Sequence, residues 1–323
     1  MKRRPFVFGG ALAVASAARG GFAQTYPSRA IRLIVPYPAG GATDFIGRNL
    51  GAALAERLGQ PVVVDNRPGA TTSVAAEALA RAPADGYTLM LADTATLATN
   101  PSLYHKLPYD PLRDFVPIAR VARIPLILVV AAESPPVSVG SLLQAARVRP
   151  GAMTYGSPGL GSPHHLATEL FRRRAGIDVR HVPYRGAAPV LQDLIGGRID
   201  FAFLDLPTAQ GALAGNRVRA LGVGTRHRLR ALPAMPTLDE QGVAGFDAFA
   251  WQGIVAPVRL PMSLVTALYR AVDAALLGPA LAQRLGDGGV EPFPAPPGRF
   301  ATFVADETRR WAQVISEADI RLE

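Results

Sequence analysis

The residue types best suited to binding chemistry lie near the amino end. Residues 31–44 read Ile-Arg-Leu-Ile-Val-Pro-Tyr-Pro-Ala-Gly-Gly-Ala-Thr-Asp, an apolar strand that runs into a Gly-Gly turn and then a helix start. The first amides of a helix lack internal partners and lie at the positive end of its dipole, and glycines let a ligand approach the backbone closely. The stretch therefore predicts a site for a carboxylate or another small anion.

Asp44 is the acidic residue of this stretch, and its position allows two interpretations. It lies in the first turn of the predicted helix, where a carboxylate interacts favourably with the helix dipole. In a functional role it would orient a bridging water or a hydroxyl or amino group of a ligand. In a structural role it is a helix-start acid and nothing more.

The elements that must position this site alternate between strand and helix. Strands are predicted at 31–35, 62–65 and 87–92, and apolar residues every four positions predict a helix from Ile46 to Leu58 with Thr43 as its N-cap. A shorter helix is predicted at 74–81. This order implies a parallel sheet, whose ligands lie beyond the carboxyl ends of its strands. Three loops then surround one site, and they supply the candidate ligand-binding residues Tyr37, Thr43, Thr71 and Thr94.

The rest of the chain predicts a second α/β lobe and a return to the first. Apolar runs at 117–121 and 125–132 are interpreted as one strand that leaves the first lobe and another that enters the second. The second lobe has predicted strands near 153–156, 179–182, 199–204 and 218–222, and helices near 164–174 and 188–195. Final helices are expected at about 261–277 and 297–315. The predicted boundaries are 24–123 with about 250–323 for lobe 1, and about 124–249 for lobe 2.

The amino terminus has the pattern of an export signal. Basic residues at 2–4 precede an Ala- and Gly-rich apolar run, and small residues suit cleavage near Ala23, so residues 1–23 are predicted to be a signal peptide. Arg3 and Arg4 also fit a twin-arginine signal, which leaves the Sec and twin-arginine routes open. Either route predicts a soluble periplasmic protein, because the chain has no Cys to carry a lipid anchor.

Composition argues against several other classes of function. The absence of Cys removes disulfides, thiolate nucleophiles and zinc–thiolate sites. The net charge of +9 falls to +5 without the predicted signal peptide, and the basic residues are dispersed, so nucleic-acid binding is not expected. Adjacent His164 and His165 would point in different directions on a helix and do not predict a metal site. No nucleotide-binding glycine motif or nucleophile elbow occurs, and we expect neither an enzyme nor a cofactor.

Many ordered motifs along the chain resemble the periplasmic solute receptors of the tripartite tricarboxylate transporter family, the Bug receptors. The motifs that carry this resemblance are Tyr26-Pro27-Ser28-Arg29, residues 35–41, residues 64–70, Ala84-Asp85-Gly86-Tyr87-Thr88-Leu89, Leu107-Pro108-Tyr109-Asp110-Pro111, Tyr155-Gly156-Ser157, His181-Val182-Pro183-Tyr184, Leu206-Pro207-Thr208-Ala209 and residues 232–237. The resemblance implies a type II venus-flytrap fold, in which two α/β lobes close on a hinged cleft.

The resemblance also implies a class of ligand, a mode of ligand binding and protein partners. In the family, two glycine-containing loops hold a carboxylate largely with backbone amides, hydroxyls and ordered water, which carries over here to Ala39, Gly40, Gly41, Ser157, Gly161 and Ser162. The implied ligand is a small organic acid or amino acid, and the implied partners are a large and a small integral membrane subunit. We expect a monomer. The alternative is a sensory receptor that acts with a signalling partner.

Two departures from the family pattern predict an altered pocket. Asp205 stands where many relatives have an amide, and an acid at the cleft edge favours a ligand with a donor group, although Asp205 is also placed to cap the next turn. Thr71-Thr72-Ser73 stands where relatives often have Gly-Gly-Asn. Larger side chains at these positions should make the cleft narrower on that side.

Overall fold

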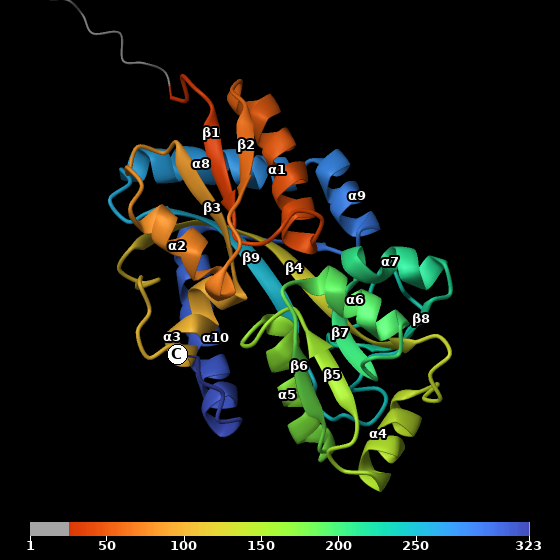
Figure 1. Cartoon of the computed structure of the whole chain (residues 1–323). Helices are drawn as coiled ribbons and strands as arrows, with labels where there is room; N and C mark the ends of the chain where they lie inside the picture. Colours follow the sequence, from red (N-terminus) through yellow and green to blue (C-terminus); the bar gives the residue numbers. More distant parts are fainter. Residues whose placement is uncertain (1–25, 323) are drawn as a thin grey trace, which may run out of the picture.

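The computed structural model describes residues 26–322, which form two α/β lobes joined by a long shared strand (Figure 1). The predicted signal peptide and its cleavage site near Ala23 lie outside the described residues. Lobe 1 contains the amino-terminal strands together with the last part of the chain, and lobe 2 contains the middle of the chain.

Lobe 1 is built on a sheet in the order β2-β1-β3-β9-β4, with β10 also paired to β4. The pairs β1–β2 and β1–β3 are parallel, whereas β9 is antiparallel to both β3 and β4. Its elements are β1 (Ile31–Val35), α1 (Ala42–Leu58), β2 (Val62–Asn66), η1 (Ala70–Thr72), α2 (Ser73–Ala80), β3 (Thr88–Asp93), η2 (Ala95–Thr99), α3 (Asn100–Leu103), the first part of β4 (Phe115–Ala131), β9 (Phe249–Pro257), α8 (Met262–Leu276), α9 (Pro279–Asp287), β10 (Glu291–Ala295) and α10 (Pro297–Glu317).

Lobe 2 continues the sheet from the second part of β4. There β4 is antiparallel to β7 and β8, and β5 lies parallel between β7 and β6. Its elements are α4 (Val139–Val148), β5 (Thr154–Ser157), α5 (Pro163–Ala175), β6 (Arg180–Pro183), α6 (Ala187–Ile195), β7 (Phe201–Asp205), α7 (Leu206–Ala214) and β8 (Val218–Val223).

The strand β4 corrects one expectation. The two apolar runs predicted as separate strands form one continuous strand of 17 residues. It pairs with β9 as far as Pro125 opposite Phe249, and from Leu126 it pairs with β7. Irregular pairing with β9 near Pro117 and Arg120 is accommodated as register shifts, and β4 continues through both runs.

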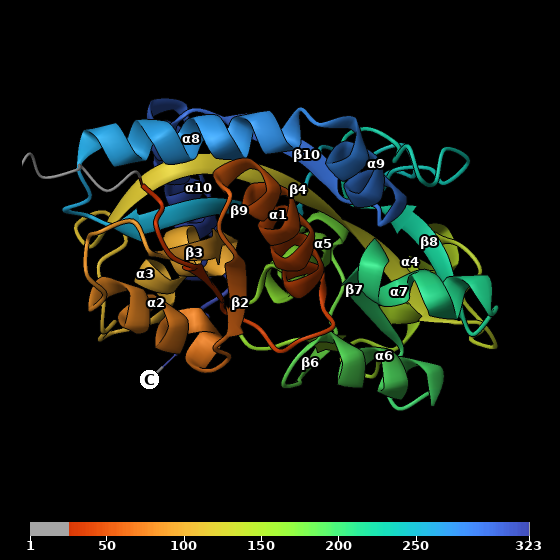
Figure 2. The ribbon, with the colours of Figure 1, turned by 90° about the horizontal axis from the view of Figure 1, so that it is seen from above.

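Apolar residues form three clusters around the sheet. In lobe 1, one cluster lies between the sheet and α1, α8 and α9, and Figure 2 shows α8 alongside β4. In lobe 2, another cluster lies beneath α6 and α7. The largest cluster runs through both lobes beneath α2, α10, α4 and α5. Alternate residues of β4 divide between clusters, since Leu126 and Leu128 enter the shared one while Ile127 and Val129 enter the lobe 2 one.

Other predicted elements agree with the structure within a few residues, but the start of α1 does not. The helix begins at Ala42 with Gly41 as its N-cap, so the prediction of Thr43 as N-cap was wrong. The Thr43 hydroxyl instead accepts a hydrogen bond from the side chain of Gln252. The elements η1, η2, α3, β9, α4, α7, α9 and β10 were not predicted.

Within residues 26–322, no individual helix combines the length and apolar character needed to cross a bilayer. The pair α8 and α9 meets that test only when joined across a 66° bend.

Candidate functional site

A cavity of about 350 Å³ lies between the two lobes. Lobe 1 contributes its β1–α1 loop, the end of β3 and part of β9, and lobe 2 contributes the starts of α5, α6 and α7. The lining residues are 37–43, Asp93, Ile124, Ala250 and Gln252 from lobe 1, and Pro158, 162–164, 185–189, Leu191, Gln192, Asp205, Pro207 and Thr208 from lobe 2.

Four helix amino termini converge on this cavity. The N-cap residues of α1, α5, α6 and α7 all line it: Gly41, Ser162, Gly186 and Asp205. Ser162 and Asp205 cap their own helices, since their side chains accept hydrogen bonds from the amides of His165 and Thr208. Gly41 and Gly186 have no side chain to do so. The first amides of α1 and α6 are therefore not used by a side-chain cap, and uncapped helix starts of this kind, one from each lobe, are suited to binding an anion.

Asp44 braces the loop that precedes α1. Its Oδ2 accepts hydrogen bonds from the Gly40 amide at 3.0 Å and from Arg48 Nε at 2.9 Å, and its Oδ1 accepts one from Asn66 Nδ2 at 2.9 Å. Burial acts to raise the pKa of Asp44, but these hydrogen bonds outweigh it and hold the pKa below its usual value. The bracing holds Gly40 at a φ of +91°, a backbone conformation that favours glycine.

The half-buried Tyr37 pairs with the buried Asp93 at the lobe 1 wall. The Tyr37 hydroxyl donates to Asp93 Oδ2 at 2.7 Å, and Asp93 Oδ1 accepts from the amide and the hydroxyl of Thr96. Burial, followed by the charge of Asp93, raises the pKa of Tyr37 well above its ordinary value, so the phenol stays protonated. Every oxygen of Asp93 thus already accepts a hydrogen bond from lobe 1 itself.

The adjacent histidines of α5 face different surroundings. His164 lines the cavity, and its Nε2 lies 3.2 Å from Asp205 Oδ2. Burial acts to raise the pKa of Asp205, but His164 and Thr208 hold it below the usual value. His165 turns into the protein, where it stacks on His181 with ring centres 4.0 Å apart. The expectation of different directions agrees with this geometry.

Seven of the candidate residues derived from the sequence line the cavity: Tyr37, Ala39, Gly40, Gly41, Thr43, Ser162 and Asp205. Five others lie off its surface: Asp44, Thr71, Thr94, Ser157 and Gly161. Ligand contact by any of the twelve remains a prediction.

The residues off the cavity surface have other partners. Thr94 hydrogen-bonds to the backbone of Trp251, and the hydroxyl of Ser157 lies 2.6 Å from His181 Nε2. Thr71 and Gly161 lie where the lobes touch. The Thr71 hydroxyl donates to the Leu160 carbonyl at 3.4 Å, and a Cβ on Gly161 would lie 2.3 Å from Cδ1 of Leu103.

Among the lining residues that were not candidates from the sequence, three have notable roles: Asp93, Gly186 and Gln252. Asp93 follows directly on a predicted strand whose loop was already assigned to the site. Gly186 precedes a predicted helix, as Gly41 does. Gln252 is a lone polar residue within the apolar run from Phe249 to Ala256, and a polar residue in a buried strand is the signal that would have found it.

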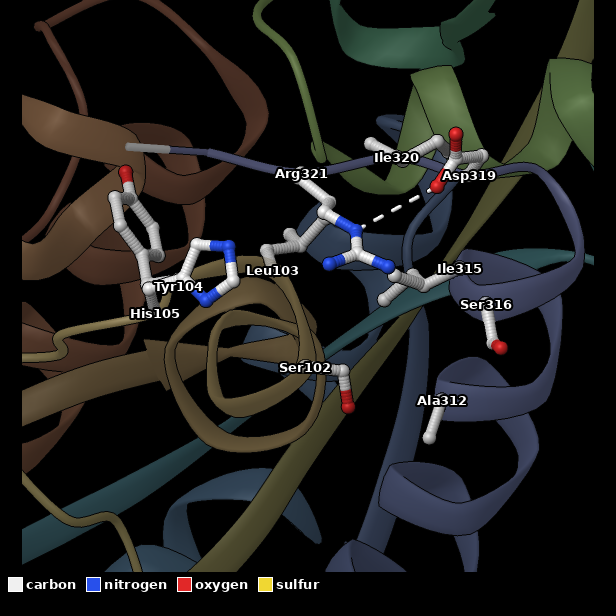
Figure 3. Close-up of a pocket in the computed structure, with 10 residues that line it drawn as sticks. All are labelled: Ser102, Leu103, Tyr104, His105, Ala312, Ile315, Ser316, Asp319, Ile320 and Arg321. Carbon is white, nitrogen blue, oxygen red and sulfur yellow. Dashed lines mark ion pairs between the residues drawn. The ribbon is translucent and has the colours of Figure 1, made fainter.

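Another cavity, of about 310 Å³, lies between α3 and the carboxyl end of α10 (Figure 3). Its lining includes Ser102, His105 and Arg321, and Arg321 Nε lies 3.5 Å from Asp319 Oδ1. All of its lining residues belong to lobe 1, so a ligand there would not bridge the lobes. Across residues 26–322, no group of three or more His, Asp or Glu side chains is placed to hold a metal ion.

Comparison with known proteins gives consistent matches over nearly the whole chain. The family model described as tripartite tricarboxylate transporter family receptor matches residues 46–320. Protein BugT of Bordetella pertussis is 37% identical over 100% of this chain and 99% of its own length. The structure of R. palustris Rpa4515 with adipate has a TM-score of 0.88 and 38% identity, covering 92% of this chain and 99% of that one.

A further solved structure extends the comparison. MatC from Rhodopseudomonas palustris with bound malate has a TM-score of 0.82 and 32% identity, covering 90% of this chain and 100% of that one. The predicted fold class, two α/β lobes of the periplasmic-binding-protein type, is confirmed by these structures.

Proposed function

Because this chain belongs to the tripartite tricarboxylate transporter receptor family, whose members are periplasmic solute-binding proteins, we propose that it captures a small organic carboxylate between its lobes. It then delivers that acid to the integral membrane subunits of a transporter. The family resemblance drawn from the sequence motifs is confirmed by the family match.

The observation that carries this proposal is the pair of helix starts without a side-chain cap. Gly41 is the N-cap of α1 in lobe 1 and Gly186 is the N-cap of α6 in lobe 2, and both line the cavity. A carboxylate between them accepts hydrogen bonds from amides of both lobes and lies at two positive dipole ends. Such a ligand binds the closed arrangement better than an open one, so binding shifts the population towards closure.

The dimensions of the cavity and the relatives support the same class of ligand. A volume of about 350 Å³ is at the small end of ligand pockets and suits a short acid. The related structures are described with adipate and with malate, both small dicarboxylic acids. Arg185, an exposed residue of lobe 2, adds a positive charge to the lining.

Location and assembly follow from the proposal. The predicted signal peptide at residues 1–23 directs export to the periplasm, where the mature chain acts as a monomer without a cofactor. The twelve candidate residues named from the sequence remain our prediction for the ligand-binding set, with lobe boundaries near residues 124 and 250.

Thermal denaturation of ligand-stripped mature protein, residues 24–323, tests the proposal. A panel of mono-, di- and tricarboxylates and amino acids is added, and an acid at 100 times its dissociation constant should stabilise the folded state by about 2.7 kcal/mol. No shift with any acid, in a sample shown to be folded, would contradict the proposal.

A variant of Gly41 separates binding from folding. An aspartate at an N-cap accepts hydrogen bonds from the first amides of its helix. Gly41→Asp should therefore leave the ligand-free protein as stable as before while abolishing the shift with acids. Gly211→Asp adds the same charge on α7 outside the cavity lining and serves as the control.

A further inference from the structure

Gln252 places a buried acceptor at the cavity. It lies in β9, between β3 and β4, and only 1% of its surface is exposed. Its Nε2 donates a hydrogen bond to the Thr43 hydroxyl, whereas its Oε1 is buried and has no hydrogen-bond partner among the described residues. A buried amide oxygen without a donor is unfavourable, and because Gln252 lines the cavity, a ligand group bound there can supply that donor.

A second unpaired acceptor, a nitrogen of His164, belongs to the opposite wall. The carboxylate of Asp205 can only accept, so His164 Nε2 carries the hydrogen between them. His164 Nδ1 is then an acceptor in the neutral imidazole, and it too is buried without a partner in the described part of the chain. Gln252 belongs to lobe 1 and His164 to lobe 2, and both residues line the cavity, so each lobe has a cavity-lining side chain with an unpaired acceptor atom.

The charges nearby favour the same kind of ligand group. Asp93 and Asp205 are buried carboxylates that line the cavity, with 3% of each residue exposed. Their oxygens already accept hydrogen bonds from Thr96, Tyr37, Thr208 and His164, so they act on a ligand mainly through their charge. That charge repels a second carboxylate placed near them and attracts an ammonium group.

We infer that the ligand of this cavity is an organic acid that also carries a hydrogen-bond donor, a hydroxyl or an ammonium group, and that Gln252 selects for that donor. The inference rests on the proposed function and narrows its ligand class. The carboxylate lies at the starts of α1 and α6, and the donor reaches Gln252 Oε1. An unsubstituted acid of the same length leaves that oxygen unpaired.

Calorimetric titration of the mature protein with matched acids tests the inference. The series are succinate, malate and aspartate; glutarate, 2-hydroxyglutarate and glutamate; and adipate and 2-aminoadipate. In the series that binds, the donor-bearing acid should bind about tenfold or more tightly than the unsubstituted one, because a buried polar group is left unpaired without it. Comparison of hydroxy with amino acids identifies the donor.

Variants assign the selectivity to Gln252. Gln252→Leu should bring the affinities of the substituted and unsubstituted acids within about twofold of each other. Gln252→Glu keeps an acceptor and a similar shape, so the preference for a donor should persist, with amino acids gaining over hydroxy acids. Gln210→Leu makes the same change at an exposed glutamine of α7 outside the cavity lining and should leave the preference unchanged.

The outcomes separate the two proposals. Binding of acids with equal affinity for substituted and unsubstituted members, or a preference that survives Gln252→Leu, overturns the inference and leaves the proposed function standing. A preference for unsubstituted acids that Gln252→Leu removes would mean that the amide presents its N–H to the cavity, which also overturns it. Absence of binding by every acid overturns both.

Discussion

A stack of aromatic rings lies next to the lobe 2 loop that contains Gly161. Its histidines show how single residues determine the pH range over which the protein is stable. His165 and His181 are stacked, and Tyr155 stacks on His181 with ring centres 4.9 Å apart. The Gly161 amide donates to His165 Nδ1 at 3.0 Å, which requires that nitrogen to be unprotonated. Burial, followed by the neighbouring His181, lowers the pKa of His165 to about 3, and burial lowers the pKa of His181 to about 4.

These shifts predict a loss of stability in mild acid. Both folded-state pKa values lie below the ordinary histidine value of 6.5, so between about pH 6.5 and 4 the unfolded chain takes up protons that the folded chain does not. The contribution of the two neutral histidines to the free energy of unfolding is therefore complete above about pH 6.5. It should fall as the pH drops, by up to about 1.4 kcal/mol per pH unit for each histidine. Urea unfolding at several pH values measures this slope.

A variant assigns the slope to the stack. His165→Gln should be less stable at pH 8, because it loses the stacking, but its stability should fall less steeply below pH 6.5. Glu169 and Arg172 remain beside the site in both proteins, so their contributions are common to the comparison. His105→Gln, at an exposed histidine, is the control. An unchanged slope in His165→Gln would refute the assignment.

At the residue scale, the sequence is informative where the geometry is local. The Gly-Gly turn and the helix start that follows it depend on neighbours in the chain, so the residues from Tyr37 to Thr43 could be placed at the site. Gln252 is recognisable in the sequence as a polar residue in an apolar run, but its place at the site is not, because its partner Thr43 is 209 positions away and the two meet only once β9 has paired with β3. The roles of Asp93 and Gly186 likewise depend on how the lobes come together.

The three residues of the short helix η1 have a backbone conformation that their side chains disfavour. Ala70, Thr71 and Thr72 have φ values of +43°, +45° and +74°, in the left-handed region that favours glycine. The hydroxyls of Thr71 and Thr72 each take part in hydrogen bonds, with the Leu160 carbonyl and with Thr96. Ala70 is exposed and offers only its carbonyl, to the Tyr104 hydroxyl.

Ala70→Gly should therefore stabilise the protein. Glycine removes the Cβ strain but adds freedom to the unfolded chain, so we expect a net gain of about 0.5 kcal/mol in the free energy of unfolding. Ala52→Gly, at an exposed position within α1, should instead cost about 1 kcal/mol. Urea denaturation of both variants provides the comparison, and a loss of stability in Ala70→Gly would show that its backbone is not strained.

Elements were predictable where an apolar pattern was bounded by turn residues. This holds for β1, β2 and β3 and for the helices α1, α5 and α10. The strand β9 was missed because its nine buried residues carry no alternation, as expected for a strand with both faces covered. The continuity of β4 was missed for a related reason, since tertiary pairing on both sides outweighs the local effect of its prolines.

Across the whole molecule, the apolar clusters explain where the lobes are joined and where they part. The cluster beneath α5 and α10 runs through both lobes, whereas those beneath α1 and beneath α6 and α7 are separate. The cavity between the lobes lies between these separate clusters. The Arg173–Glu317 ion pair, 2.8 Å apart, connects α5 with α10 on the joined side.

A shared cluster predicts that the lobes unfold together. Both tryptophans, Trp251 and Trp311, belong to lobe 1 and donate to the same oxygen of Glu307, so tryptophan fluorescence reports on lobe 1 alone. Far-UV circular dichroism reports on helices of both lobes. The two signals should give the same urea midpoint. A separate dichroism step without a fluorescence change would show that lobe 2 unfolds independently.

The two faces of β9 separate the residues that line the cavity from the residues that pack in the core. Ala250 and Gln252 face the cavity, while Trp251 and Gly253 face Phe300 of α10, where a Cβ on Gly253 would meet the Phe300 ring at 2.2 Å. Substitutions at alternate positions therefore act on different properties. New ligand preferences can evolve, or be engineered, at positions 250 and 252 while the intervening residues keep the protein folded.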